Sequence, residues 1–492
     1  MSLGTIAKSN YSKAVQTLIN KIHDRTDVQD SLYEQATQYF LDADKLAQQQ
    51  TAAEQEVYLF NQRLGQTPAS EKAKIEQQLD KAEKSLRQVS ASLDQLRLQR
   101  LEQLKELCYS VLQLSEGEDA DDTHVMTAKL LGTIQLMSPT EGKLVVVSNQ
   151  KSKHLYKAVL ALRLLDRLLL DEQISNSYVL KRYQDKTEYD IEITGGRIYQ
   201  PFRDDVQIPL LMAALVQDIG QYHPEAQQIL LGPDGDQDEF RVLDNPERVA
   251  MLQINYKESL KYITQAIGKD KYIGNSKDQR AWFDRNEQEK LGFIVTLLKN
   301  SIKPEQGIGN LLKIPQIYTS VVLSTKHNYS YESIPKVGLV LDKAVEKGMC
   351  SKTAADGLMR ITGIFPQGYG ITYIPKDSDK QDLDRYEYAI VTSLYPPHPN
   401  VPICRMVTRN LTYQISVMGC TVRVENNLFF PQARKKLERI KPERLKEILE
   451  KLVSNLEERQ NMALIPKCWH PTEYFTYAKN QNLWNKAINH HF

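Results

Sequence analysis

Apolar and polar residues alternate along the first 115 residues in the pattern of long α-helices. Gln, Ala, Glu, Lys and Leu dominate this stretch, and neither Gly nor Pro occurs between Thr5 and Gly65. Farther along, apolar residues recur in alternating steps of four and three, which is the spacing of a coiled-coil seam. The seam consists of Ile75, Leu79, Ala82, Leu86, Val89, Leu93 and Leu96. Residues 1–115 are therefore predicted to form a helical coiled-coil arm.

The helical pattern breaks at Thr67 and Pro68. Thr67 suits the N-cap and Pro68 the first position of a second helix, so the chain is expected to fold back as an antiparallel hairpin. The seam would then meet Val57, Phe60 and Leu64 of the first helix. Heptads show that a partner helix exists but not whose it is, so an intrachain hairpin and a dimerisation or partner-binding arm both stay open. Deleting the arm is expected to leave a folded remainder.

Residues 116–152 are predicted to be an acidic linker followed by a short mixed segment. The run 116–122 is rich in carboxylates and poor in apolar residues, which favours a solvated linker and a domain boundary. Residues 143–147 include three consecutive valines and predict a strand. A long apolar helix is expected over residues 155–170, and a half-buried strand over residues 189–193.

The rest of the chain divides into a helical part and a β-rich part. Residues 153–360 are predicted to form a helical domain. Residues 361–430 should form a small sheet, because β-branched and aromatic runs alternate there with Pro, Asp and Asn. In residues 431–492, a charged amphipathic helix over 431–458 precedes an aromatic tail. The predicted fold class is mainly α, with an N-terminal helical coiled-coil hairpin, a helical bundle and a small β-rich closing segment.

Composition excludes several classes of function. The 63 basic and 62 acidic side chains nearly cancel, so no net charge favours DNA or RNA as a partner. The five cysteines are scattered without C-x-x-C spacing, which argues against a zinc ribbon or a redox dithiol and suits a reducing compartment. The N-terminus lacks the features of a signal peptide, and charged residues interrupt the most apolar stretch. A cytoplasmic protein without a membrane span is expected.

One short sequence motif resembles a motif of a known superfamily. An apolar helix leads into Asp218-Ile219-Gly220, and this ending resembles the His-Asp-Ile-Gly-Lys motif of HD-domain phosphohydrolases. Gln217 stands where that motif has His, and Gln221 where it has Lys. His154 is a candidate for the family's early histidine, although a lone His beside an apolar helix is more often structural.

Later landmarks follow the order of the HD-GYP branch of that superfamily, and the resemblance covers a little over half of the chain. Asn255 replaces the His of a His-Pro pair, and two glycines survive from the Gly-Tyr-Pro region. The closing Gly-Ile-Phe-Pro-Gln-Gly turn at residues 363–368 is similar to the family's own. The positions that match former site residues, called the vestigial positions below, are Gln217, Asp218, Gln221, Asn255, Ser301, Ile302, Gln306, Gly307, Gly309, Val322 and Thr325.

The resemblance implies a fold without the family's chemistry. Such enzymes use several His and carboxylate ligands to hold paired metal ions that generate hydroxide. Amides are weak neutral ligands and aliphatic side chains are none, so no metal, cofactor or catalytic residue is predicted. Asp218 is the one ligand-type residue left in register, and it is expected to cap a helix or pair with a nearby Arg or Lys. No Walker A, G-x-G-x-x-G or G-x-S-x-G motif offers another chemistry.

The expected function is therefore that of a catalytically inactive, HD-GYP-like bacterial signalling or scaffold protein. It would act through protein–protein interaction, with the helical arm binding a protein partner or a second copy. The alternative is a non-hydrolysing receptor that keeps a cyclic dinucleotide, cyclic di-GMP, in the old cleft. An active metal-dependent phosphodiesterase rebuilt from other carboxylates is the least favoured hypothesis.

Overall fold

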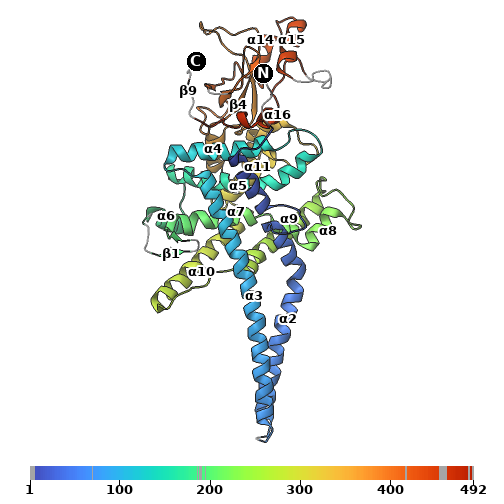
Figure 1. Ribbon diagram of the computed structural model, residues 1–492, viewed down its shortest axis with the longest axis vertical. Helices are drawn as coiled ribbons and strands as arrows, with labels where there is room; N and C mark the ends of the chain where they lie inside the picture. The colour runs from blue at the N-terminus through green and yellow to red at the C-terminus, as the bar shows by residue number, and fades with distance from the viewer. Residues whose placement is uncertain are drawn as a thin grey trace.

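The computed structural model describes residues 6–68, 70–185, 187, 191–193, 196–415, 418–453, 463–485 and 488–489. Helices make up most of this part of the chain, and strands are few and short, which confirms the mainly α fold class with a small β segment. Figure 1 shows a helical body, a long helical pair extending from one side of it, and a small sheet at the opposite end. Among the described residues, no helix combines the length and apolar character needed to cross a bilayer.

Two long antiparallel helices, α2 (Leu32–Gln66) and α3 (Lys72–Ser115), form the arm, as the periodicity predicts. The α2 helix begins at Ser31 with a reciprocal capping box to Glu34. The predicted N-cap at Thr67 is wrong, because Thr67 ends α2 in an extended conformation. A residue that precedes proline is disfavoured in the helical region, so Pro68 places the break one turn before α3 begins.

The predicted seam joins the two helices of the arm. Ala53 and Ala82 are buried, while Val57 and Phe60 of α2 and the large seam residues of α3 up to Leu93 are half-buried. A pair of helices leaves one side of its seam open, which accounts for this partial burial. Leu96, predicted as the last seam residue, is 41% exposed.

The base of the arm belongs to the body. The short helix α1 (Asn10–Ile22) buries Val15 and Ile22 in the main core, and Leu104 and Val111 of α3 lie in that same core. Arg97 donates a hydrogen bond to the carbonyl oxygen of Ile267 at 2.8 Å, where α3 reaches the body. The predicted boundary at residue 115 thus falls inside a shared core, and only the distal hairpin projects.

The acidic run is not a linker, which corrects the prediction for residues 116–122. Asp119 is the N-cap of α4 (Ala120–Met137), and its carboxylate accepts a hydrogen bond from the Asp122 amide at 2.8 Å. Asp121 and Asp122 lie in the first turn of α4, where negative charge is favourable to the helix dipole.

A single helix, α5 (Leu144–Leu170), runs through the centre of the body and corrects the predicted strand over residues 143–147. The three valines begin this helix, and Val145 and Val146 are buried. Tertiary packing overrides their β propensity. The α5 helix packs against α7 (Ile208–Val216), α11 (Asn310–Val322) and α13 (Lys352–Thr362).

The remaining body helices surround this core. They are α6 (Ser177–Gln184), α8 (Pro224–Leu231), α9 (Asn245–Lys261), α10 (Lys277–Asn300) and α12 (Val337–Glu346). Of the strand predicted over residues 189–193, positions 189 and 190 lie outside the described residues. Its end forms β1 (Glu192–Ile193), which pairs with β2 (Arg197–Ile198).

The predicted β-rich segment forms a five-stranded sheet in the order β3-β4-β5-β8-β9. Its strands are β3 (Gly370–Tyr373), β4 (Glu387–Val391), β5 (Ile403–Met406), β8 (Met418–Thr421) and β9 (Ile488–Asn489). The first four are antiparallel neighbours, and β9 pairs in parallel with β8. A small hairpin, β6 (Thr408–Arg409) and β7 (Thr412–Tyr413), lies beside it.

The C-terminal residues cover one face of this sheet. The helix predicted over 431–458 is two helices, α14 (Pro431–Leu437) and α15 (Pro442–Leu452), and residues 454–458 lie outside the described residues. Pro442 starts the second helix because its missing amide hydrogen and fixed φ suit the first turn. The aromatic tail follows with α16 (Thr472–Phe475), and the indole of Trp469 donates a hydrogen bond to the Ala389 carbonyl oxygen at 2.8 Å. The described C-terminal residues therefore complete the sheet core.

Candidate functional site

Four of the vestigial positions meet where α7 ends against α9. The side-chain amide of Asn255 donates a hydrogen bond to the Gln217 carbonyl oxygen at 3.1 Å, and the Gly220 amide donates to the Ser259 hydroxyl at 3.0 Å. A Cβ at Gly220 would collide with the backbone carbonyl of Asn255, so glycine permits this close approach. The Gln221 amide donates to the Asp218 carbonyl oxygen at 3.2 Å. The resemblance implies that Gln217, Asp218, Asn255 and Gly307 lie close together, and the structure brings the first three together, whereas Gly307 lines a separate cavity.

Asp218 is the charged residue at this junction, and both of its carboxylate oxygens have partners. The Lys157 ammonium lies 2.6 Å from Oδ2, and the Gln316 amide donates to Oδ1 at 3.1 Å. Lys157 comes from α5 and Gln316 from α11, so three separate elements fix the carboxylate. The pair is nearly inaccessible, with 3% of the lysine side chain and 9% of the aspartate side chain exposed.

Electrostatics keep this carboxylate ionised. Burial by itself would raise the pKa of Asp218, but the ammonium groups of Lys157 and Lys153 outweigh burial and hold the pKa below its usual value. The carboxylate is therefore a structural anion neutralised by lysine, as the sequence suggested when it assigned Asp218 a pairing role. The cation beside this carboxylate is the Lys157 ammonium.

Two buried histidines lie near this junction. Tyr33 donates its hydroxyl hydrogen to the Leu215 carbonyl oxygen at 2.8 Å, so its oxygen accepts a hydrogen bond from Nδ1 of His154, 2.9 Å away. His154 is therefore the neutral Nδ1–H tautomer. It stacks on His23 at a ring separation of 5.4 Å, and His23 is hydrogen-bonded to the Tyr222 hydroxyl.

Burial also keeps both imidazoles neutral. It lowers the pKa of His23 to about 3, with further lowering by the charges of Lys153 and Arg25, and it lowers the pKa of His154 well below its usual value. Neutral imidazole is the form that binds metals, but two rings alone make an incomplete ligand set. In the described part of the chain, no group of three or more His, Cys, Asp or Glu side chains is arranged to hold a metal ion.

The remaining vestigial positions are dispersed. Gln306 and Gly307 line a separate cavity of about 230 Å³ whose described lining includes neither Asp218 nor Asn255. Ser301 ends α10 and donates its hydroxyl to the Leu298 carbonyl oxygen at 2.8 Å.

The last four vestigial positions differ in their surroundings. Gly309 lies against the backbone of Asn300 so closely that a Cβ would collide with it. Val322 is fully buried at the end of α11, whereas Ile302 is 48% exposed and Thr325 is half-buried in the segment after α11. None of these side chains adds a ligand to Asp218, so the residues present do not fit the metal centre that the resemblance implies.

The residues that define this junction include several that the sequence prediction missed. Lys157, Gln316 and Tyr33 were not assigned a role, although Lys157 interrupts a strongly apolar helix. A lysine at such a position must find a buried anion, and Arg163 on the same helix shows the same behaviour with Glu116 at 3.0 Å. The sequence feature that could have revealed this pairing is a charged residue inside an apolar helix.

Comparisons with protein-family models, with curated protein sequences and with solved structures found no match.

Proposed function

We propose that this chain is a catalytically inactive, HD-GYP-like signalling or scaffold protein that acts through protein–protein association of its helical arm. Support for inactivity comes from the ion pair between Lys157 and Asp218, because the lysine charge already neutralises the carboxylate that a metal would need. All five cysteines are free and buried, which supports a place in the bacterial cytoplasm.

The observation that carries the proposal is the apolar surface of the arm. Leu41, Tyr58 and Leu59 on α2 are 60%, 61% and 51% exposed. Leu41 lies at the base of the arm, where it lines a pocket with Asp24 and Tyr222. Tyr58 and Leu59 are neighbours on the part of α2 that extends away from the body (Figure 1), and an exposed apolar pair on a projecting element offers an interaction surface.

Charge favours a second copy of the chain as the partner. From Asp42 to Gln66, α2 carries four carboxylates and two cations, whereas from Lys72 to Arg97, α3 carries six cations and four carboxylates. Two hairpins packed antiparallel would place the acidic helix of each against the basic helix of the other. Such an arrangement is a two-fold symmetric four-helix bundle, in which both copies use the same surface.

Substituting the exposed apolar pair should abolish this association. We expect the variant Tyr58→Lys/Leu59→Lys to remain folded but to be monomeric, because buried interface anchors contribute about 2 kcal/mol each or more. Light scattering coupled to size-exclusion chromatography measures the mass of each species. The control Gln77→Lys/Ser90→Lys adds the same charge to exposed positions of α3 and should stay dimeric.

A monomeric wild-type chain at concentrations on the order of tens of micromolar, well above a typical dimer Kd, would contradict self-association. Equal loss of dimer in both variants would show that added charge, rather than the apolar pair, controls assembly.

The receptor hypothesis has less support. A cyclic dinucleotide at the vestigial positions would have to displace Lys157 and Gln316 from Asp218, which leaves a buried carboxylate without partners. Active hydrolysis has the least support, because it also needs metal ligands that the described residues do not group together.

A further inference from the structure

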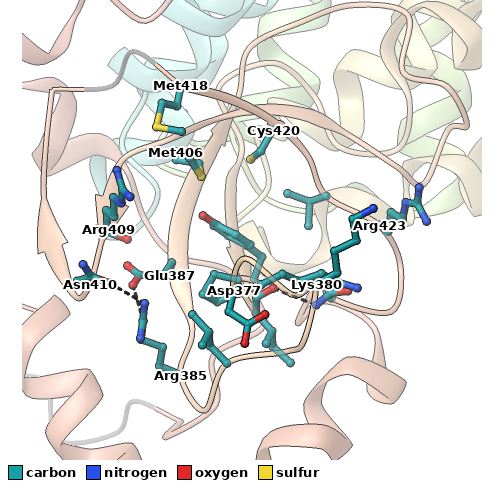
Figure 2. A pocket seen from close by; sticks show the side chains of 18 of the residues that line it. Asp377, Lys380, Arg385, Glu387, Met406, Arg409, Asn410, Met418, Cys420 and Arg423 are labelled. Carbon is teal, nitrogen blue, oxygen red and sulfur yellow. Dashed lines mark hydrogen bonds and ion pairs between the residues drawn. The ribbon is translucent and has the colours of Figure 1, made fainter. Parts of the chain in front are cut away.

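A cavity of about 570 Å³ lies on the face of the sheet opposite the C-terminal helices. Residues that pair directly across antiparallel strands have their side chains on the same face of the sheet. Tyr373 pairs with Glu387, and Cys404 pairs with Cys420. The cavity is lined on this face by Tyr373, Met406, Met418 and Cys420, which form an apolar floor around the Glu387 carboxylate. Figure 2 shows the two methionines and the cysteine together at one end of the pocket.

The rim of this pocket is cationic, although the chain as a whole is nearly neutral. Five cationic side chains and two carboxylates line it. Lys380, Arg409 and Arg423 are exposed at the rim, and their side chains make no hydrogen bond or ion pair with any residue that the structure describes. In the view of Figure 2, Arg409 and Arg423 lie on opposite sides of the pocket.

Both carboxylates of the lining are already hydrogen-bonded, and together they offset only two of the five cationic charges. Glu387 accepts hydrogen bonds from Nε of Arg385 and from the Leu411 amide, each at 3.0 Å. Asp377 accepts from the amides of Asp379 and Gln381, each at 2.9 Å, within its own turn.

These same contacts and one more fix the turns that carry two of the free cations, Lys380 and Arg409. The Asp377 turn holds Lys380, and the amide of Lys380 donates to the Asp377 carbonyl oxygen at 3.2 Å. On the other side, Arg385 donates to the Asn410 side-chain oxygen at 2.7 Å, beside Arg409. Cations on ordered turns need less reorganisation to bind an anion than cations on mobile loops.

We propose that this pocket binds a small organic anion, with an aryl or acyl body against Tyr373, Met406 and Met418 and an acidic group held by the free cations of the rim. The cavity volume lies within the range of small-ligand sites, and an apolar floor with a few polar groups at the edge is typical of them. Guanidinium groups suit carboxylate, phosphate or sulfonate oxygens because they donate two parallel hydrogen bonds.

Fluorescence titration with 8-anilinonaphthalene-1-sulfonate tests the proposal, because this probe combines an aryl body with one sulfonate. We expect the variant Arg409→Gln/Arg423→Gln to bind the probe at least about tenfold more weakly than the wild type. Both arginines are exposed, so the substitutions should not disturb folding. The control Lys277→Gln/Arg285→Gln removes the same charge from exposed positions of α10 and should bind as the wild type does.

Two further ligands separate the contributions of charge and apolar body. N-phenyl-1-naphthylamine, which lacks the sulfonate, should bind both double variants equally. In displacement of the sulfonate probe, 1-naphthyl phosphate should act at concentrations about tenfold or more below those of inorganic phosphate.

Equal affinity of the sulfonate probe for the two double variants would overturn the proposal, as would displacement by inorganic phosphate as effective as that by naphthyl phosphate. Neither result depends on the state of the helical arm, so this proposal and the proposed function can fail separately.

Discussion

Replacing Lys157 with methionine should lower the free energy of unfolding by about 3–5 kcal/mol. The substitution keeps the length of the side chain but removes the ion pair of the buried Asp218 carboxylate, which keeps the Gln316 amide and the more distant charge of Lys153. A buried carboxylate that loses its ion-pair partner keeps its desolvation cost and loses most of the compensation. Urea unfolding followed by circular dichroism measures the loss.

A double-mutant cycle isolates the pair from other effects of the substitution. The variant Lys157→Met/Asp218→Asn should be considerably more stable than the sum of the two single changes implies, because it leaves no unpaired charge. The matched control is Lys84→Met, which breaks the exposed pair with Asp80 at 2.7 Å and should cost less than about 1 kcal/mol. If Lys157→Met costs no more than this control, the pair does not hold the junction together.

Deleting residues 1–115 should prevent folding altogether, contrary to the expectation from the sequence. That deletion removes α1 and the end of α3, which bury Val15, Ile22, Leu104 and Val111 in the main core. Each large core side chain lost costs about 2–5 kcal/mol, and the total exceeds the stability of an ordinary domain. The test measures whether the truncated protein is soluble and whether it unfolds in a cooperative transition.

Excising only the distal hairpin gives the contrasting result. The Arg100 guanidinium lies 5.0 Å from the Tyr39 ring centre, which sets the register of the two helices at their base. Replacing residues 47–92 with a short Gly-Ser turn should therefore close without strain and leave a folded monomer. A folded product from the longer deletion would show that α1 is dispensable to the core, whereas an unfolded product from the excision would show that the hairpin is part of it.

Much of the fold could be predicted from the local pattern of residue types. The heptad steps of residues 75–93 reflect contacts that recur along one element, and periodicity records such contacts. The β-branched and aromatic runs at the β3 and β4 strands suit the buried sheet that they form. The failure at residues 143–147 had a specific cause. Three valines favour a strand locally, but Val145 and Val146 face a core that the sequence alone does not display.

The candidate site was predicted in part. The resemblance led us to expect Gln217, Asp218, Asn255 and Gly307 at one place, and the first three lie together. The pairing of Asp218 with Lys157, 61 residues away, follows from the packing of α5 against α7 and has no local signature beyond one lysine in an apolar helix. Nothing in the sequence indicated that Gly307 would line a separate cavity.

Metal content and hydrolysis together test the central claim most directly. Protein purified without chelator should contain far less than one iron, manganese or zinc per chain, and should not cleave bis(p-nitrophenyl) phosphate or cyclic di-GMP. The reason is that Asp218 is bonded to Lys157 and Gln316 in place of a metal. Two bound transition metals per chain, with turnover that disappears in Asp218→Ala, would contradict the account.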